Sequence, residues 1–513
     1  MKIFFITQGS SLQVFDRCAD FLAELKYLTA AGCFVTGRSN FDGWAKSTGR
    51  ESEYDIVLKE WEILRSGRNN PPTAARLNEM ERMLGVPTLW PVAVADRRFM
   101  NGALSKYVQR YTPPYSHERL AGQTYALVEA LRDAFDRFKP DVVISFGPAI
   151  AGAIAARMVA RKAGIPFLTL KSTKILNLVT LSPTDSNTNP HIEETMASLT
   201  VENCPEEVLS FARAYLDKVQ AGATQYEGDI LPKFHSGIVG SLGRFALNLP
   251  MALMRDIRRS LTGDDDHQVA PFCATAYHST IGAALRKARS SRPTATKDAF
   301  VGRSPVVFLP LGAEPEIANS VYAPYLTNQI EVARNVARCI PMGAILKVKD
   351  HPRCFGVRTP GYYRALRRIP NVEVVPTNAP THDLIKGSDA VVCVSSFVAT
   401  EAMLAQKPVL TFGPCGLEGI PETMVKPVCG FENLAQDLQG MLSAYSYDEV
   451  AVIRFLMATY LHSVAINLYS DLLVKPNRHK DSGGPTDPDD QIRRFADYIK
   501  LRVDETVAAK RVA

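Results

Sequence analysis

A histidine, a proline and charged residues directly follow an apolar segment in the stretch AILKVKDHPRCFG, residues 344–356. An imidazole can carry a proton near neutral pH, so His351 is able to donate to a phosphate oxygen or to protonate a leaving group. Lys349 and Arg353 add positive charge, and Pro352 stiffens the turn. The same residues would also make an ordinary turn after a strand, so the stretch alone leaves both interpretations open.

Positive charge is concentrated around this histidine, where the acidic residues between 347 and 374 are Asp350 and Glu373. Guanidinium and ammonium groups are the usual protein partners of phosphate, so this composition at a strand edge favours a nucleotide mono- or diphosphate. The basic residues of the same segment are Lys347, Lys349, Arg353, Arg358, Arg364, Arg367 and Arg368.

A second polar stretch, VSSFVATEA, occupies residues 394–402 between a strand-like and a helix-like segment. Ser395 or Ser396 can cap the helix, and the free N–H groups and the dipole of a helix N-terminus favour a phosphate. Glu401, about one turn further along, would accept hydrogen bonds from ribose hydroxyls. A simple helix cap with a solvated glutamate is the competing interpretation.

Short apolar segments alternate with helix-like segments in both halves of the chain. This alternation predicts an α/β fold in which parallel sheets are covered by helices, as two Rossmann-like domains that face each other across a cleft. The expected strands are residues 3–7, 31–37, 142–146, 167–170, 306–311, 344–349, 372–375, 390–394 and 408–413.

The predicted division of the chain is into residues 1–295, residues 305–474 and a polar loop with a C-terminal helix at 475–513. Residues 286–305 have the small, polar and proline-rich composition of a linker. The stretch LPMALMRDIRRSL, residues 249–261, is a basic amphipathic helix candidate, which fits either a membrane surface or packing between domains.

Composition limits the function classes. The 513 residues are 46% hydrophobic and 22% charged, which is enough for a large core in two or three domains. The net charge of +6 suits anionic ligands or a membrane surface but is too small to indicate nucleic acid. Nine scattered cysteines favour a reducing compartment, and we find no signal peptide or long apolar run. We therefore expect a cytoplasmic protein that is at most peripheral to a membrane.

Ligands of open α/β sheets bind where strands end at their carboxyl edge, because loops and helix N-termini converge there. Besides the two stretches above, this rule selects the turn after Val35, the turn with Gly9, Ser10 and Ser11, and the loop with Gly147. No P-loop, GxGxxG, HExxH or GxSxG motif is present, which argues against ATPase, dehydrogenase, metalloprotease and hydrolase functions. The acidic run GDDDH lies in a polar loop, where we expect it to be solvated, and no metal site is predicted.

Three stretches together resemble the capsule polysaccharide biosynthesis family, which includes bacterial β-Kdo transferases of capsule and lipopolysaccharide assembly. They are FLPLGAEPE at 308–316, LKVKDHPR at 346–353 and LIKGSDAVVCVSSFVATEAMLAQKPVLTFG at 384–413. The resemblance is specific over residues 306–413. In the first half, KPDVVISFG and GIPFLTL are similar to the N-terminal lobe of many GT-B glycosyltransferases.

The resemblance implies a GT-B fold in which the C-terminal domain binds the activated sugar and the N-terminal domain binds the acceptor. It also implies a metal-independent glycosyltransferase without a cofactor, whose substrates are a nucleotide sugar, with CMP-Kdo or another CMP-linked ulosonic acid favoured, and a glycan or glycolipid. The sequence is similar to bacterial sialyltransferases as well, where a His-Pro pair and a serine pair contact CMP; the matching positions are His351-Pro352 and Ser395-Ser396. Gly312 and Ala313 depart from the pattern of relatives, which leaves the donor open.

Glycosyl transfer requires stabilisation of the departing phosphate, for which His351 is the candidate, and a carboxylate near the acceptor or the anomeric carbon. Glu314, Glu316, Glu227 and Asp229 are candidates for that carboxylate, and the sequence does not choose among them. Retention or inversion of stereochemistry is therefore open as well.

Three other functions fit parts of the pattern. A CDP-glycerol-type glycerophosphotransferase has similar His-Pro and serine-glutamate elements but would need a second histidine, such as His278 or His235. A sugar-nucleotide 2-epimerase shares the two-lobe fold, although matching carboxylates are not evident in the first half. A non-catalytic GT-B scaffold is the alternative from another class.

Overall fold

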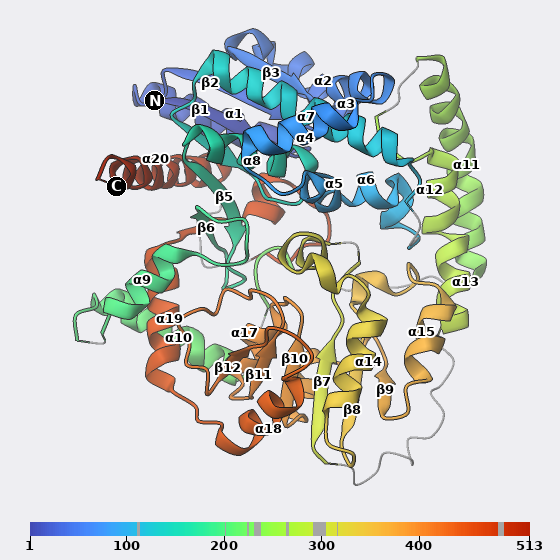
Figure 1. Cartoon of the computed structure of the whole chain (residues 1–513), viewed down its shortest axis with the longest axis vertical. Helices are drawn as coiled ribbons and strands as arrows, with labels where there is room; N and C mark the ends of the chain where they lie inside the picture. The colour runs from blue at the N-terminus through green and yellow to red at the C-terminus, as the bar shows by residue number, and fades with distance from the viewer. Residues whose placement is uncertain are drawn as a thin grey trace.

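Two β-sheets, each covered by helices on both faces, lie one above the other in the computed structural model (Figure 1). We call the seven-stranded sheet and its helices the N-terminal lobe, and the six-stranded sheet and its helices the C-terminal lobe. The described residues are 1–109, 113–200, 202–222, 225–229, 238–262, 266–290, 304–314, 316–480 and 487–512.

The N-terminal sheet has the strand order β13-β6-β5-β4-β1-β2-β3, and it is parallel except that β6 runs antiparallel to both β5 and β13. Successive side chains of β1 point to opposite faces, so Phe5 packs in one apolar cluster and Phe4 in another. Its strands are β1 Lys2–Ile6, β2 Ala30–Val35, β3 Ile56–Lys59, β4 Val142–Ser145, β5 Phe167–Ser172, β6 Leu178–Ser182 and β13 Val464–Ala465.

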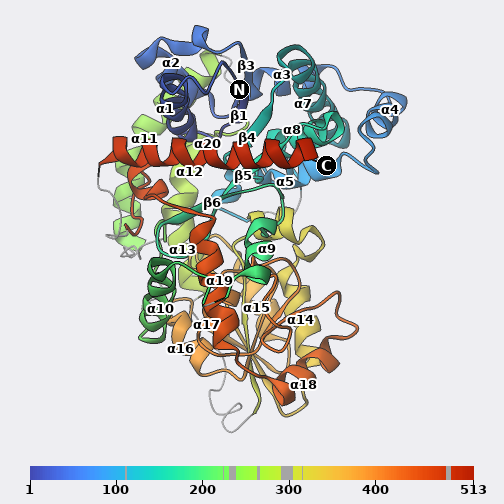
Figure 2. The same ribbon diagram turned by 90° about the vertical axis from the view of Figure 1, so that its left-hand side faces the viewer.

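Helices cover both faces of this sheet, and the long C-terminal helix α20 packs against α1 beside the N-terminus (Figure 2). The covering helices are α1 Ser11–Glu24, α2 Arg38–Thr48, α3 Glu60–Asn69, α4 Ala74–Leu84, α5 Trp90–Ala95, α6 Arg97–Asn101, α7 His117–Phe138, α8 Ala151–Ala163 and α20 Pro488–Val512.

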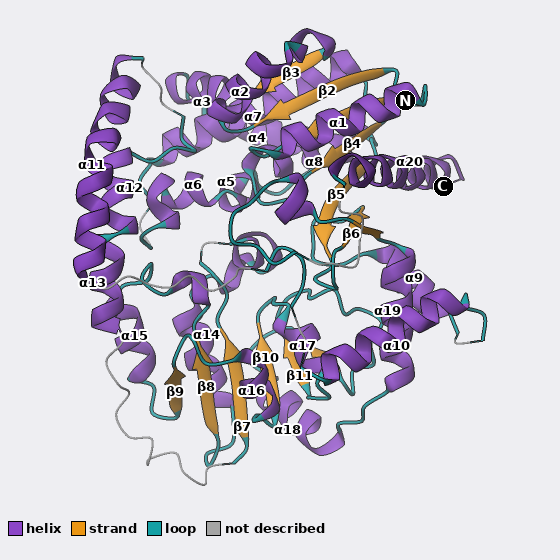
Figure 3. Cartoon of the chain, turned by 180° about the vertical axis from the view of Figure 1, so that it is seen from behind, coloured by secondary structure: helices purple, strands orange, loops and turns teal. Residues whose placement is uncertain are grey.

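The C-terminal sheet is parallel throughout its described strands, in the order β12-β11-β10-β7-β8-β9 (Figure 3). Its strands are β7 Val306–Pro310, β8 Ile345–Lys349, β9 Val372–Val375, β10 Ala390–Cys393, β11 Val409–Thr411 and β12 Val425–Pro427. Its helices are α14 Gln329–Cys339, α15 Pro360–Arg367, α16 Thr381–Lys386, α17 Val398–Leu404, α18 Leu434–Ala444 and α19 Glu449–Leu461.

The expected α/β class with parallel sheets covered by helices is confirmed. In chain order the C-terminal strands read 3-2-1-4-5-6, and the first five N-terminal strands read 3-2-1-4-5, which is the doubly wound Rossmann pattern. The boundaries of the predicted division stay a prediction. The chain passes between the lobes more than once, because β13 joins the N-terminal sheet while α9 Pro190–Ser198 and α10 Glu206–Gln220 pack against α19.

Three further helices run along one side of both lobes: α11 Ile238–Leu261, α12 Phe272–Ser279 and α13 Ile281–Ser290 (Figure 1). The basic amphipathic helix predicted at 249–261 is the second half of α11. The linker prediction is wrong at residues 286–290, which are the end of α13, and residues 291–303 lie outside the described part of the chain. Arg286 anchors this helix because its guanidinium donates to the carbonyls of Gly356, at 2.5 Å, and Tyr107, at 2.9 Å.

Short 3₁₀ and π turns complete the secondary structure. The 3₁₀ turns are η1 Arg50–Glu53, η2 Ala103–Lys106, η5 Pro324–Leu326 and η6 Pro352–Cys354, and the π turns are η4 Ala318–Tyr322 and η7 Leu468–Leu472. Within the described residues, no helix has the length and apolar content that crossing a membrane requires.

A half-buried histidine at the end of α19 joins segments of both lobes. His462 Nδ1 lies 3.0 Å from Arg502 on α20, and its Nε2 lies 2.6 Å from the Thr195 hydroxyl on α9. A guanidinium can only donate, so Nδ1 accepts and the ring is neutral. Burial, Arg502 and His191 lower the pKa of His462 to about 4.

We expect this histidine to make the protein sensitive to acid. Because an unfolded histidine has a pKa of roughly 6.5, the unfolded chain binds the extra proton between about pH 6.5 and pH 4, and the free energy of unfolding falls as the pH falls through that window. His462→Asn keeps an acceptor for Arg502 and should lose part of that pH dependence, up to about one proton. Urea unfolding at several pH values measures this pH dependence, with the exposed His117→Asn as control. If the free energy of unfolding changed with pH equally in the wild type and in His462→Asn, His462 would not be the group responsible.

Candidate active site

The polar stretches singled out in the sequence meet at the carboxyl edge of the C-terminal sheet. Glu314 and Glu316 follow β7, His351 follows β8, and Ser395 and Ser396 follow β10. Strand β7 lies between β8 and β10, so His351 and the serines are separated by two strand spacings, about 10 Å. This edge includes the β7–β10 switch point, where doubly wound sheets bind ligands.

His351 has a fixed orientation at this edge. Its Nδ1 accepts a hydrogen bond from the backbone N–H of Arg353 at 3.2 Å, which caps the turn η6. Burial, the largest effect, lowers the pKa of His351, so the ring is neutral at pH 7. Because Nδ1 accepts, the neutral ring carries its proton on Nε2, which makes Nε2 the hydrogen-bond donor for a ligand.

A fully buried arginine holds the loops after β7 and β8 together. Arg358 has no exposed side-chain surface, and its guanidinium contacts Asp350 at 2.8 Å and Glu314 at 2.9 Å. It also donates to the carbonyl of Gly312 at 2.8 Å, while the Tyr363 hydroxyl donates to Asp350 at 2.5 Å. Asp350 directly precedes His351, so this network fixes the backbone from which the histidine projects.

Glu314 is held by this network. Gln109 of the N-terminal lobe and Gln329 each donate to one of its oxygens, and Arg358 pairs with the Gln109-bound oxygen. Burial raises the pKa of Glu314, and Arg358 and the two amides oppose that effect. Burial alone lowers the pKa of Arg358, but Asp350, Tyr362 and Glu314 outweigh it and the pKa is raised.

Glu316 is the more exposed of the two carboxylates that follow β7. It forms an ion pair with Arg353 at 2.7 Å, and both side chains are partly exposed. Its charge opposes the burial that lowers the pKa of His351 in the C-terminal lobe and of Arg97 and Lys174 in the N-terminal lobe. The geometry therefore favours Glu316 over Glu314 as a group that reaches a substrate.

Lys349 is buried, and its ammonium group donates to the Thr381 hydroxyl at 2.6 Å. Burial lowers its pKa, and the nearby Glu401 opposes that effect. Lys349 and Arg358 of the predicted phosphate-binding segment are thus inside the lobe and paired with side chains of this protein.

The two serines have different environments. The buried Ser395 donates to the carbonyl of Pro414 at 2.6 Å, whereas the half-buried Ser396 accepts from the backbone N–H of Val398 at 3.2 Å. The Ser396 hydroxyl can still donate its own hydrogen to a ligand. Helix α17, which follows, has seven residues, so the local N–H groups rather than a long helix dipole are available to an anion.

The matching edge of the N-terminal sheet carries the predicted glycine and serine turns. Gly9 has a φ of 56°, the Ser10 hydroxyl accepts from the Lys475 ammonium at 3.0 Å, and the Ser11 hydroxyl accepts from the Gln8 backbone at 2.8 Å. Gly147 follows the adjacent strand β4, and its carbonyl accepts from Ser145. This places Gly9, Ser10, Ser11 and Gly147 at the switch point of the other sheet.

Basic residues between the two edges were missed by the sequence analysis. Burial lowers the pKa of Lys106, and Arg97, Arg353 and Lys475 lower it further, so charges from both lobes meet here. The ammonium group of Lys174 lies 4.7 Å from the centre of the Tyr226 ring. No motif marks these residues, because they come from separate loops. Their shared charge is suited to an anionic substrate.

The remaining candidates have structural contacts. Glu227 is buried and accepts from the backbone of Tyr469 at 2.9 Å and of Ser470 at 2.8 Å. Asp229 lies in the same loop, where its carbonyl accepts from the His479 backbone. His278 packs beside Arg286, and His235 lies outside the described residues.

The acidic run GDDDH was expected to be solvated, which is wrong for its last two residues, Asp266 and His267. Asp266 and His267 are 2% and 7% exposed, because the Asp266 carboxylate accepts from the backbone of Arg38 at 3.1 Å and of Gln268 at 2.8 Å. Residues 263–265 lie outside the described part. Within the described part of the chain, one small cavity borders His267. A second cavity, larger than the first, is lined by Trp61, Lys59 and Arg65 among others.

Residues 326–419 match the family described as "Capsule polysaccharide biosynthesis protein". The family is therefore indicated by this segment, which is less than a fifth of the chain. The segment contains His351, Ser395, Ser396 and Arg358. A search of curated protein sequences finds no significant match to the chain.

Solved structures with similarity to the chain include two from Thermosulfurimonas dismutans. The KpsC beta Kdo 2,7 transferase is 14% identical, with a TM-score of 0.36, over 73% of this chain and 89% of that one. The KpsC beta Kdo 2,4 transferase is also 14% identical, with a TM-score of 0.36, over 72% and 87%. UDP-GlcNAc 2-epimerase from Neisseria meningitidis is 13% identical, with a TM-score of 0.25, over 90% and 100%. These TM-scores are low, so the family assignment rests on the matched segment.

Arg358 should matter more for stability than Arg353, although both pair with a glutamate. Arg358→Met leaves two buried carboxylates without their counter-charge and should cost about 3–5 kcal/mol of unfolding free energy. Arg353→Met breaks a partly exposed pair and should cost about 0–1 kcal/mol. Urea unfolding measures both, and adding Asp350→Asn to Arg358→Met should recover part of the loss. Equal losses for the two single variants would contradict the proposed role of the network.

Proposed function

We propose that this protein is a glycosyltransferase that takes a sugar from a nucleotide donor to build bacterial capsule or lipopolysaccharide. CMP-Kdo or another CMP-linked ulosonic acid is the favoured donor. One observation supports the proposal most strongly. The segment that matches the family, residues 326–419, contains both His351 and Ser396, which lie on either side of the switch point at the carboxyl edge of the C-terminal sheet. The Thermosulfurimonas proteins, which are named as Kdo transferases, are consistent with it at the level of overall architecture only.

The donor phosphate would lie between His351 and Ser396. When the glycosidic bond to the nucleotide breaks, negative charge develops on the phosphate, and Nε2–H of His351 and the hydroxyl of Ser396 would donate to it. Both groups are already oriented by backbone contacts, so little reorganisation is needed. The partly exposed Arg353 adds positive charge at the same turn.

Glu316 would serve the acceptor. A partly exposed carboxylate can accept the proton of an attacking hydroxyl. It forms an ion pair with Arg353 beside the donor site, while the basic residues Lys106 and Lys174 offer an anionic acceptor its counter-charge. No metal ion is needed for these roles.

Nucleotide binding tests the donor assignment. We expect CMP to raise the Tm of the wild type more than UDP or GDP, and His351→Ala to weaken CMP binding by roughly 10- to 100-fold, because a hydrogen bond to a charged group contributes about 1.5–3 kcal/mol. Glu316→Gln should retain CMP binding and lose transfer. The exposed His117→Ala serves as the matched control.

Other outcomes select other functions. Equal stabilisation of the wild type and His351→Ala by CMP would show that the phosphate binds elsewhere. Stabilisation by CDP-glycerol with glycerophosphate transfer would favour the glycerophosphotransferase. Turnover of a UDP-sugar without acceptor would favour the epimerase, and binding of no nucleotide would favour the scaffold.

We further propose that the enzyme works at the cytoplasmic surface of the inner membrane through α11. One face of this helix is apolar and exposed, including Leu247 at 82%, Leu261 at 82% and Met254 at 58%. Arg255 and Arg258 flank that face, which suits an anionic lipid surface. The other exposed large apolar residues of α11 are Ile238, Val239, Leu242, Met251, Leu253 and Ile257.

Vesicle binding tests this surface. The wild type should co-sediment with vesicles that contain phosphatidylglycerol and much less with pure phosphatidylcholine. Leu247→Glu with Met254→Glu should reduce binding by more than about 10-fold, since each change removes buried apolar area and adds repulsion. Leu501→Glu, an exposed leucine on α20, is the control. Unchanged sedimentation of the double variant, with an unchanged circular dichroism spectrum, would exclude α11 as the membrane contact.

A further inference from the structure

Three potential metal ligands from distant segments meet inside the N-terminal lobe, away from the two carboxyl edges. Glu60 is the first residue of α3, directly after β3. Asp96 lies between α5 and α6, and His267 lies in the loop that follows α11. One carboxylate oxygen of each acid and one ring nitrogen of His267 all lie within 4.8 Å of one another.

The three side chains are deeply buried and incompletely bonded. Glu60, Asp96 and His267 are 1%, 2% and 7% exposed. Glu60 Oε1, Asp96 Oδ2 and His267 Nδ1 are buried atoms without a hydrogen-bond partner. A buried polar atom without a partner costs about 1–3 kcal/mol, so three of them in one cluster indicate that a ligand is missing there.

The bonded atoms of the same residues orient the group. Asp96 Oδ1 accepts from the backbone N–H of Arg98 at 2.8 Å and caps α6, and Glu60 Oε2 accepts from the Gln268 amide at 3.1 Å. The His267 ring packs edge-on against Phe99, with ring centres 5.4 Å apart. His267 Nε2 lies 3.0 Å from the Gln268 amide nitrogen and 3.8 Å from Glu60 Oε2, so Nδ1 is the ring atom without a hydrogen-bond partner.

The charge of the cluster favours a cation. Two carboxylates, Glu60 and Asp96, are buried together with a third, Asp266, which lies 3.8 Å from His267. Burial and the neighbouring carboxylates raise the pKa of Glu60, while burial lowers the pKa of His267. A metal ion would replace a proton on the carboxylates, and it requires the neutral form of the imidazole.

We propose that Glu60, Asp96 and His267 bind a divalent transition-metal ion, Zn²⁺ or Mn²⁺, at a structural site. One imidazole and two carboxylates are a ligand set that these ions accept, whereas Mg²⁺ prefers oxygen ligands and keeps more of its water. Ligand atoms of a tetrahedral zinc site are roughly 3.3 Å apart, so closure from 4.8 Å requires side-chain shifts of about 1 Å.

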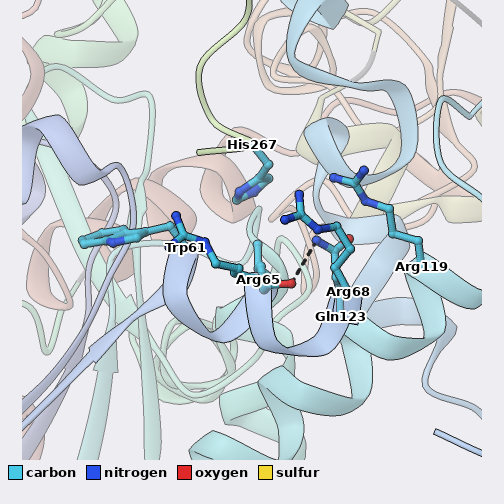
Figure 4. Close-up of a pocket in the computed structure, with 7 residues that line it drawn as sticks. Trp61, Arg65, Arg68, Arg119, Gln123 and His267 are labelled. Atoms are coloured by element: carbon cyan, nitrogen blue, oxygen red, sulfur yellow. Dashed lines mark hydrogen bonds between the residues drawn. The ribbon is translucent and has the colours of Figure 1, made fainter. Parts of the chain in front are cut away.

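The surroundings of His267 leave room for a further ligand. A cavity of about 10 Å³ borders His267, Arg119 and Gln123, which is close to the space that one water molecule needs (Figure 4). Arg65 and Arg68 also line this cavity, and Figure 4 draws their side chains together with His267. Arg98 and Arg119 lower the pKa of His267 and so help to keep its ring neutral.

The metal would fasten α11 to the N-terminal lobe. Arg259 of α11 donates to the carbonyls of Asp266, at 2.8 Å, and Val269, at 2.6 Å, so the loop that carries His267 is tied to the end of this helix. Glu60 and Asp96 belong to segments that pack in the lobe itself. An ion between them would close the junction between α11, α3 and α6.

Metal titration of the full-length protein tests the site. After treatment with a chelator and dialysis, the wild type should bind one equivalent of Zn²⁺ or Mn²⁺ by calorimetry, and Zn²⁺ should raise its Tm. His267→Asn and Glu60→Gln should each weaken binding by more than about 10-fold, since loss of even an outer contact to a metal ligand costs 10–100-fold. Substitution with Co²⁺ should give visible absorption bands in the wild type that both variants lack.

Matched controls separate this site from adventitious binding. Glu60→Gln keeps an acceptor for Gln268 and is nearly isosteric, so it should fold even if His267→Asn does not. His479→Asn, outside the cluster, should bind the metal as the wild type does. Less than about a tenth of an equivalent of bound metal in the wild type, or wild-type affinity in folded Glu60→Gln, would overturn the proposal.

Discussion

The ion pairs of Arg358 fix the geometry on which the candidate active site depends. Removing a guanidinium and two carboxylates from water is costly, and only close pairing with additional hydrogen bonds offsets it. Asp350 and Glu314 meet that requirement from the loops after β8 and β7. Because each acid is one or two residues from a functional candidate, the network holds His351 and Glu316 in place without using either of them.

The same network reaches the other lobe. Gln109 donates to Glu314, and its backbone N–H donates to the carbonyl of Val357 at 3.1 Å. Arg286 makes a second bridge from the helices on the side of the molecule to Gly356 and Tyr107. The loop from 350 to 358 therefore contacts the N-terminal lobe directly. These contacts link the arrangement of the two lobes to the orientation of His351.

The two buried charged clusters of this protein differ in how their polar atoms are paired. Around Arg358 every carboxylate has a cationic or amide partner, whereas Glu60, Asp96 and His267 keep unpartnered atoms at a junction with α11. The first arrangement balances the charge of both carboxylates with Arg358 and explains a fixed loop. The second has buried carboxylate oxygens without a partner, which is why we propose a metal ion there and not beside Arg358.

Local pattern determined much of this protein: the apolar strands, the Rossmann order expected from βα alternation, and the polar residues at strand ends such as His351 and Ser396. These follow from sequence because strand period and parallel topology are set by neighbouring residues. Tertiary structure alone decided which charges are buried. The sequence placed Arg358 in a basic segment suited to phosphate and His267 in an acidic loop expected to be solvated, yet both are enclosed, because burial depends on partners that are distant in the chain. That is also why Glu314 is enclosed by Arg358, Gln109 and Gln329, whereas Glu316 stays partly exposed.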